Sequence, residues 1–303
     1  MPEVAPATNP VLDAPPPTAR VANVFDLHLN PGCVGIKPQS LEQLLALASG
    51  LGFTSATLPR QFVPDDAAAE AARSLAVRAG VPWRMFYLPF DVFSDKNDLA
   101  DGLALIKAEI PRAVRTGATI TYNHVFSGSD SRDFAANFAW HRERLARLYE
   151  ILQPMGVRYC LEFIGPKTYR VDFAHEFIYT LEQTIALADA VSPEIGIAFD
   201  LFHFYTSGGA VEQLGTLDAK RVYMVHANDA QSGRTRDEQM NLERAMPMAT
   251  GIIDARAMLR ALAAGGFTGP VFAEPFSPKR ERLSALPAEQ AAAEAIGSLR
   301  RCL

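Results

Sequence analysis

Short apolar runs alternate with longer amphipathic stretches along most of this chain, and this alternation limits the fold more than any other feature. The apolar runs are typical of parallel strands that are buried on both faces. Eight of them occur, at 21–27, 54–58, 84–88, 119–123, 158–163, 195–200, 221–226 and 270–274. Apolar residues at helical spacing predict helices at 41–52, 65–80, 142–156, 177–190 and 254–266.

Eight strands, each followed by a helix or a helix candidate, predict an α/β fold of the (β/α)8 TIM barrel type. A single barrel domain is expected over residues 21–303. A doubly wound open sheet has the same local alternation. The barrel is favoured because no glycine-rich dinucleotide loop follows the first run. Polar residues also end several different runs, where barrel active sites are built.

Residues 1–20 differ from the rest of the chain and hold six of its 21 prolines, which predicts an extended, Pro-rich N-terminal tail. This segment lacks the basic start and apolar centre of a secretory signal. The three cysteines are widely spaced, so a reducing, cytoplasmic location is expected. A net charge of -5 argues against a nucleic-acid partner. No apolar run approaches the roughly 20 residues of a membrane span, so no membrane partner is expected either.

Four successive strands in the second half each end in a side chain that can bind a metal ion. These side chains are Glu162, Asp200, His226 and Glu274. Three carboxylates at one barrel mouth would repel one another and raise one another's pKa, and a divalent cation would remove that repulsion. Each residue alone has an ordinary explanation; Asp200, for example, could cap the following helix. Four such residues on consecutive strands favour one metal site. The donor set suits Mn²⁺, Mg²⁺ or Co²⁺, with Zn²⁺ as a further candidate.

This ordered set resembles the xylose isomerase-like TIM barrels. Within them it is similar to the sugar (phosphate) isomerase/epimerase group, which includes ketose 3-epimerases and inosose dehydratases. The residues that carry the resemblance are Glu162, Asp200-Leu-Phe-His203, His226 and Glu274 followed by proline. The resemblance implies one divalent ion, preferably Mn²⁺, held by Glu162, Asp200, His226 and Glu274. It also implies that His203 contacts the substrate and that copies of the chain pair as a homo-oligomer.

Further substrate-binding residues are expected from the resemblance and from strand-end positions. Epimerase members hold the substrate with a basic residue in the loop after the metal-binding histidine, and here Arg234 is assigned that role. His28 follows the first strand and His124 ends the fourth, so both are predicted to face the same mouth. His141 is expected to lie on the solvated face of a helix.

The proposed chemistry is proton transfer at a carbon next to the carbonyl of a small carbohydrate. A metal ion would act as a Lewis acid that stabilises the enediolate. Glu162 and Glu274 would serve as base and acid, which gives a sugar isomerase or epimerase. Loss of a β-hydroxyl or β-alkoxy group from the same enediolate would instead give a lyase or dehydratase. Its substrate would be a keto-sugar, a keto-glycoside or an inosose.

Two other classes of function are less consistent with the sequence. Phosphodiester hydrolysis, as in the related endonuclease IV, resembles a histidine-rich multi-zinc site, whereas this chain has six scattered histidines. A non-catalytic sugar-binding barrel would not need the matched pair Glu162 and Glu274.

Overall fold

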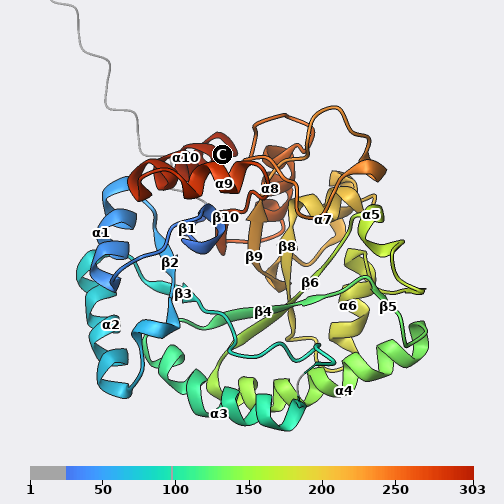
Figure 1. The fold of residues 1–303 in the computed structure, drawn as a ribbon, viewed down its shortest axis with the longest axis horizontal. Helices are drawn as coiled ribbons and strands as arrows, with labels where there is room; N and C mark the ends of the chain where they lie inside the picture. Colours follow the sequence, from blue (N-terminus) through green and yellow to red (C-terminus); the bar gives the residue numbers. More distant parts are fainter. Residues whose placement is uncertain (1–24, 97) are drawn as a thin grey trace, which may run out of the picture.

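The computed structural model describes residues 25–96 and 98–303, and in this part eight parallel strands close into a barrel inside a ring of helices (Figure 1). The order around the barrel is β1-β10-β9-β8-β6-β4-β3-β2. The strands are β1 Asp26–Leu29, β2 Ser55–Thr57, β3 Trp83–Met85, β4 Ile120–Val125, β6 Arg158–Phe163, β8 Gly196–Asp200, β9 Val222–Ala227 and β10 Pro270–Ala273. The predicted fold class is confirmed. The predicted tail at 1–20 and the start of the first predicted strand lie outside the described residues.

The outer ring and its connections contain ten helices among the described residues. They are α1 Leu41–Leu51, α2 Asp66–Ala79, α3 Leu99–Arg115, α4 Phe134–Leu152, α5 Lys167–Arg170, α6 Leu181–Asp189, α7 Leu201–Thr206, α8 Ala255–Ala264, α9 Lys279–Ser284 and α10 Ala288–Arg301. No helix in the described part of the chain is both long and apolar enough to cross a bilayer.

The helix ends show why these segments are helical. Ser40 caps α1 and Asp65 caps α2, each side chain accepting a hydrogen bond from a backbone amide of the first turn. Both helices end at a glycine with positive φ, Gly52 and Gly80, a backbone conformation that favours glycine.

Two apolar clusters stabilise the barrel. A smaller cluster fills its interior and consists of Met85, Ile120, Tyr122, Cys160, Ala198, Met224 and Phe272. The larger cluster lies between strands and helices and includes Trp83 and Phe86, which are 1% and 0% exposed. Trp83 also donates from Nε1 to the carbonyl of Ala72 in α2. The interior is therefore packed, as in other barrels of eight strands, and a site can form only at a mouth.

The bounds of one predicted strand and one predicted helix are corrected. The third predicted strand was 84–88, but β3 ends at Met85, so that Tyr87 lies in the loop that follows. The third predicted helix began at Arg142, but α4 begins at Phe134 after the cap Asp133. His141 was expected on the solvated face of a helix, but it is a buried residue of α4.

His141 is 4% exposed and lies among Phe93, Trp140 and Phe177, with ring centroids 4.6 to 4.8 Å apart. Burial lowers the pKa of this imidazole to about 4, from an ordinary value of 6.5. The folded state therefore binds its proton less readily than the unfolded state does. The stability that the neutral ring contributes is present above pH 6.5 and is lost as the pH falls toward 4.

We expect this single group to make the free energy of unfolding fall by about 2 kcal/mol between pH 7 and pH 5. In His141→Gln the decrease over this range should be smaller by about that amount, as measured by urea unfolding at both pH values. The matched control is His175→Gln, at an exposed position in the short strand β7 (His175–Glu176), and it should keep the wild-type decrease. An unchanged decrease in His141→Gln would contradict the prediction.

Candidate metal centre and active site

Four side chains from neighbouring strands converge at the mouth formed by the carboxyl ends of the strands. Glu162 lies in β6, Asp200 ends β8, His226 lies in β9, and Glu274 follows β10. Asp200 and His226 are register partners in adjacent strands. One ligand atom from each of the four lies within 4.8 Å of all the others, and all four residues are buried. The sequence prediction that these residues gather at one rim agrees with this geometry.

The arrangement fits a divalent ion. Ligand atoms at about 2.0–2.2 Å from one ion are at most about 4.4 Å apart, so the cluster needs to contract by only a few tenths of an ångström. Glu162 Oε2 is buried and makes no hydrogen bond of regular geometry among the described residues, although His124 Nε2 lies 3.2 Å away, so this charged oxygen can still be satisfied by an ion. Three carboxylates and one imidazole are a suitable donor set for Mn²⁺ or a similar ion.

His226 and Glu162 form the most tightly coupled pair in this cluster. His226 Nδ1 lies 3.0 Å from Glu162 Oε1 and 3.4 Å from Glu274 Oε2. Burial lowers the pKa of His226, but the two carboxylates outweigh burial and raise it well above its usual range. Burial raises the pKa of Glu162, but His226 and His124 outweigh it and hold the pKa well below its usual range. Positive charge on His226 thus partly balances the carboxylates, a role that a bound cation would take over.

Arg244 is a member of the site that the sequence analysis missed. Its side chain is buried, and Nη1 donates to Asp200 Oδ2 at 2.7 Å and to Glu274 Oε2 at 3.0 Å. Burial raises the pKa of Asp200, but Arg244 together with His203 and His226 outweighs burial and the net shift is downward. The guanidinium lies between the rings of Phe202 and Phe276, at 4.8 and 4.6 Å from their centroids. Arg244 therefore places a fixed positive charge against two of the four cluster residues.

The loop between β9 and α8 carries Arg244 back to the cluster. Asp229 and Ala245 form an antiparallel bridge with two backbone hydrogen bonds. The Asp229 carboxylate accepts from the amides of Thr250, Gly251 and Ile253, which ties down the end of the same loop. Nothing periodic in the sequence marks this path. The signal in the sequence was a basic residue in the loop after His226, and it was assigned to Arg234, which lies in the same loop as Arg244.

His203 has one ring nitrogen already occupied. The amide of Gly165 donates to His203 Nδ1 at 3.2 Å, so the neutral ring carries its proton on Nε2. That nitrogen lies 3.8 Å from Glu162 Oε1 and 3.0 Å from Arg244 Nη2. Arg244 Nη2 also donates to Asn241 Oδ1 at 3.1 Å, so the His203 and Arg244 side chains are in direct contact beside the cluster. Burial lowers the pKa of His203 to about 3, which favours the neutral ring.

Gly165 is glycine because the chain passes so close to His203. A Cβ at this position would lie 2.1 Å from the carbonyl oxygen of His203 and 2.7 Å from Thr206 Oγ1. No side chain fits that space without moving the backbone of α7. The close approach fixes the orientation of the His203 ring.

His124 also reaches the cluster. It is the register partner of Glu162 in β4, and its Nε2 lies 3.2 Å from Glu162 Oε2. The side chain is 44% exposed, so it borders solvent at the mouth. Burial lowers the pKa of His124, but Glu162 outweighs burial and the net shift is upward.

A family model described as xylose isomerase-like TIM barrel matches residues 45–302. The chain belongs to this family. The xylose isomerase-like barrel identified by resemblance is therefore confirmed.

Individual proteins that resemble this chain share between one-fifth and about one-third of their residues with it. The inosose isomerase of Bacillus velezensis is 34% identical over 147 residues, which are 47% of this chain and 48% of that protein. The match thus spans about half the length of this curated relative. A xylose isomerase domain protein of Alicyclobacillus acidocaldarius has a TM-score of 0.77 at 23% identity, covering 92% of this chain and 98% of that one. A structure of the IOLI protein with a binding zinc atom has a TM-score of 0.74 at 19% identity, with the same coverage. These structural likenesses support the fold.

Two residues predicted to bind substrate in this xylose isomerase-like barrel, Arg234 and His28, form contacts with other protein side chains. Arg234 Nη2 pairs with Glu243 Oε2 at 2.6 Å, and both side chains are about one-third exposed. His28 is buried, with Nδ1 2.7 Å from Ser55 Oγ and Nε2 2.8 Å from Thr57 Oγ1, so both ring nitrogens have partners. Substrate roles for Arg234 and His28 stay predictions, and the contacts of Arg244 and His203 favour those two residues instead.

Proposed function

We propose that this chain is a divalent-metal-dependent sugar isomerase or epimerase that works through an enediolate. The observation that supports it best is the convergence of Glu162, Asp200, His226 and Glu274 on one point of the barrel mouth. These four residues would hold the ion. When bound, the ion would supply Lewis-acid stabilisation of negative charge on the substrate's carbonyl oxygen. Mn²⁺ suits the donor set, and the zinc atom of the IOLI protein makes Zn²⁺ the second candidate.

Glu162 and Glu274 would carry the protons. Glu162 Oε1 and Glu274 Oε2 lie 3.0 and 3.4 Å from His226 Nδ1, so both carboxylates would be close to a ligand that meets the cluster. One glutamate removes the proton next to the carbonyl. If the other returns a proton to the opposite face of the same carbon, the product is an epimer; return to the neighbouring carbon gives an isomer.

His203 and Arg244 would hold the substrate. His203 Nε2 and Arg244 Nη2 are 3.0 Å apart, so one ligand oxygen that approached this pair could contact both side chains. A carbonyl or hydroxyl oxygen is the acceptor that a sugar offers. These donors would align the carbon acid with the glutamates, and such alignment is a large part of catalysis.

One relative is an inosose isomerase, and an inosose is a ring polyol with one carbonyl. We therefore propose a small carbohydrate with a free carbonyl as substrate. Loss of a β-substituent from the same enediolate, the lyase alternative, would use the same residues.

Proton exchange tests this proposal directly. Protein loaded with Mn²⁺ is incubated with an inosose in deuterated water, and the recovered sugar is examined by mass spectrometry and NMR. We expect deuterium at the carbon next to the carbonyl and a sugar product of unchanged mass apart from deuterium. Lack of exchange with inososes and common ketoses would contradict the proposal. Exchange accompanied by loss of water would identify the lyase.

A further inference from the structure

Asn228 is a buried amide beside the cluster that the chemistry proposed above does not use. It follows β9 and lies two residues after His226, and alternate residues along a strand share a face. Its exposed fraction is 0%, and its Nδ2 donates to Asp200 Oδ2 at 3.1 Å. Asn228 therefore contacts one of the four candidate metal ligands directly.

The carboxylate of Asp200 is held by three donors. Oδ1 accepts from the backbone amide of His203 at 2.9 Å, and Oδ2 accepts from Asn228 Nδ2 and from Arg244 Nη1, the latter at 2.7 Å. Oδ2 lies 3.8 Å from His226 Nδ1, so it is an oxygen that faces the cluster. A carboxylate oxygen has two lone pairs, and both are thus occupied at Oδ2. An ion that binds this oxygen has to replace one of its two side-chain donors.

Charge decides which of the two donors is replaced. Arg244 carries a positive charge, which a divalent ion repels at short range. Asn228 is neutral, so its amide can keep its hydrogen bond to a carboxylate that also binds an ion. Carboxylates that bind metal ions in proteins are commonly held by such hydrogen bonds. Asn228 is therefore the donor that would remain on Asp200 Oδ2.

Stability of the fold alone does not account for an amide at position 228. Asn228 Oδ1 is buried and has no hydrogen-bond partner within the described part of the chain, and an unsatisfied acceptor of this kind is costly. An apolar side chain would avoid that cost, but it would also lose the hydrogen bond to Asp200. Because these two effects oppose each other, removal of the amide should change the stability of the metal-free protein little.

We propose that Asn228 is a positioning residue for the metal site. Its amide holds Asp200 Oδ2 in the orientation that binds the ion, whereas Arg244 is the donor that the ion replaces on the same oxygen. The proposal rests on the proposed function for the presence of a divalent ion at the cluster. It adds that two donors to one oxygen have opposite effects on metal binding.

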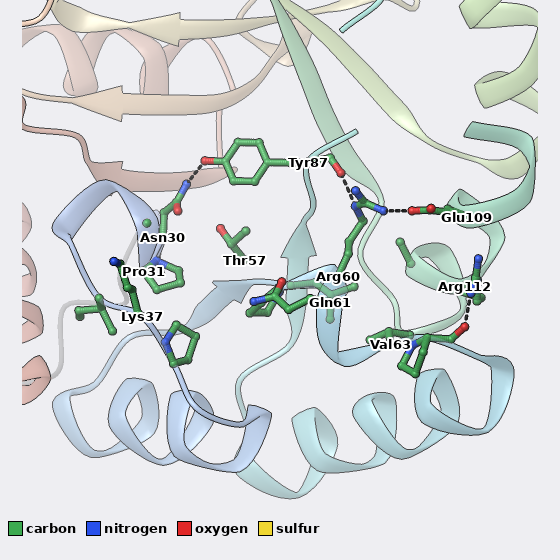
Figure 2. Close-up of a pocket in the computed structure, with 17 residues that line it drawn as sticks. Asn30, Pro31, Lys37, Thr57, Arg60, Gln61, Val63, Tyr87, Glu109 and Arg112 are labelled. Atoms are coloured by element: carbon green, nitrogen blue, oxygen red, sulfur yellow. Dashed lines mark hydrogen bonds and ion pairs between the residues drawn. The ribbon is translucent and has the colours of Figure 1, made fainter. Parts of the chain in front are cut away.

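Asn30 offers a matched control at the end of another strand (Figure 2). It follows β1, is 2% exposed and, like Asn228, has a buried Oδ1 without a hydrogen-bond partner among residues 25–96 and 98–303. Its Nδ2 donates to Tyr87 Oη at 2.6 Å, as Figure 2 shows, and Tyr87 is not one of the candidate ligands. The two asparagines thus share their burial and their unsatisfied oxygen but hold different groups.

The test measures Mn²⁺ affinity by calorimetric titration of the wild type and of alanine and leucine variants at both positions. We expect Asn228→Leu and Asn228→Ala to bind Mn²⁺ about 10–100-fold more weakly, the range typical when a hydrogen-bond partner of a metal ligand is removed. Asn30→Leu and Asn30→Ala should bind Mn²⁺ as the wild type does. Arg244→Met should change the affinity in the opposite direction, toward tighter binding. Without metal, the urea midpoint of each Asn228 variant should be close to that of the matching Asn30 variant.

The proposal and the proposed function fail in different ways. An unchanged affinity in either folded Asn228 variant, an equal loss in the Asn30 variants, or weaker binding in Arg244→Met would overturn the role of Asn228 while the wild type still binds one ion per chain. Failure of both Asn228 variants to fold in saturating Mn²⁺ would also overturn it, because the amide would then serve the fold. If the wild type bound neither Mn²⁺ nor Zn²⁺, the proposed metal-dependent function would be refuted together with the role of Asn228.

Discussion

Replacing Glu274 by glutamine is expected to lower the rate of deuterium exchange by about 10²–10⁴-fold at saturating Mn²⁺, the range for loss of a general acid or base. The amide keeps the size of the side chain and an oxygen that can contact the ion, but it cannot accept and return a proton. Glu162→Gln should have an effect of similar size, because the mechanism needs both groups. Rates are measured by mass spectrometry of recovered sugar.

Two controls separate lost proton transfer from lost metal or lost folding. Metal content is measured on the same samples, and a loss of exchange should be counted only where Glu274→Gln still binds one ion per chain. Glu281→Gln changes an exposed glutamate seven positions later, on α9, and should leave the rate unchanged. Full activity in metal-loaded Glu274→Gln would refute the catalytic role.

Replacing Arg244 by methionine is expected to destabilise the metal-free protein by about 3–5 kcal/mol, as is typical when one partner of a buried ion pair is removed. The variant leaves Asp200 and Glu274 buried beside Glu162 without the guanidinium that now pairs with two of them. A divalent ion can replace that charge. We therefore expect added Mn²⁺ to raise the free energy of unfolding more in the variant than in the wild type, and the variant to bind Mn²⁺ at least tenfold more tightly.

Arg234→Met is the matched control for this variant. Its ion pair with Glu243 is partly exposed, and such pairs contribute about 1 kcal/mol or less. Urea unfolding with and without Mn²⁺, together with calorimetric titration of the metal, measures both effects. Equal destabilisation by the two substitutions would contradict the special position of Arg244. If Arg234→Met lowered exchange activity as much as Arg244→Met, the sequence-based assignment of Arg234 would be supported after all.

The charge balance at the cluster links these two predictions. Glu162, Asp200 and Glu274 meet two internal cations, His226 and Arg244, at hydrogen-bonding distances. Two positive charges against three negative ones leave most, but not all, of the carboxylate charge balanced. Binding of an ion would require His226 to lose its proton, and it would weaken the need for Arg244 to pair with both carboxylates.

Local sequence was sufficient to predict the barrel and the four candidate ligands. The strand and helix periods can be recognised within short windows, and eight repeats leave few possible architectures. Glu162, Asp200 and His226 lie at or near the ends of such windows, so their shared rim followed from the parallel order of the strands. The position of His203 near the same rim could be predicted in the same way, because it lies three residues beyond Asp200.

The boundaries of elements were harder to predict, and errors there carried over to single residues. His141 was expected on the solvated face of a helix, but α4 begins at Phe134 and packs His141 against Phe93 and Phe177. A strand predicted to continue through Tyr87 hides that ring in a sheet, whereas Tyr87 lies in a loop and its side chain is exposed.

The sequence by itself determined the barrel, the order of its strands and the four side chains at their ends, because each depends on a short periodic pattern. Only the tertiary structure decided that Arg244 rather than Arg234 reaches the cluster, and that both nitrogens of His28 are occupied. These features depend on the paths of loops, which are set by contacts such as the Asp229–Ala245 bridge between residues far apart in the chain. No local period encodes such contacts.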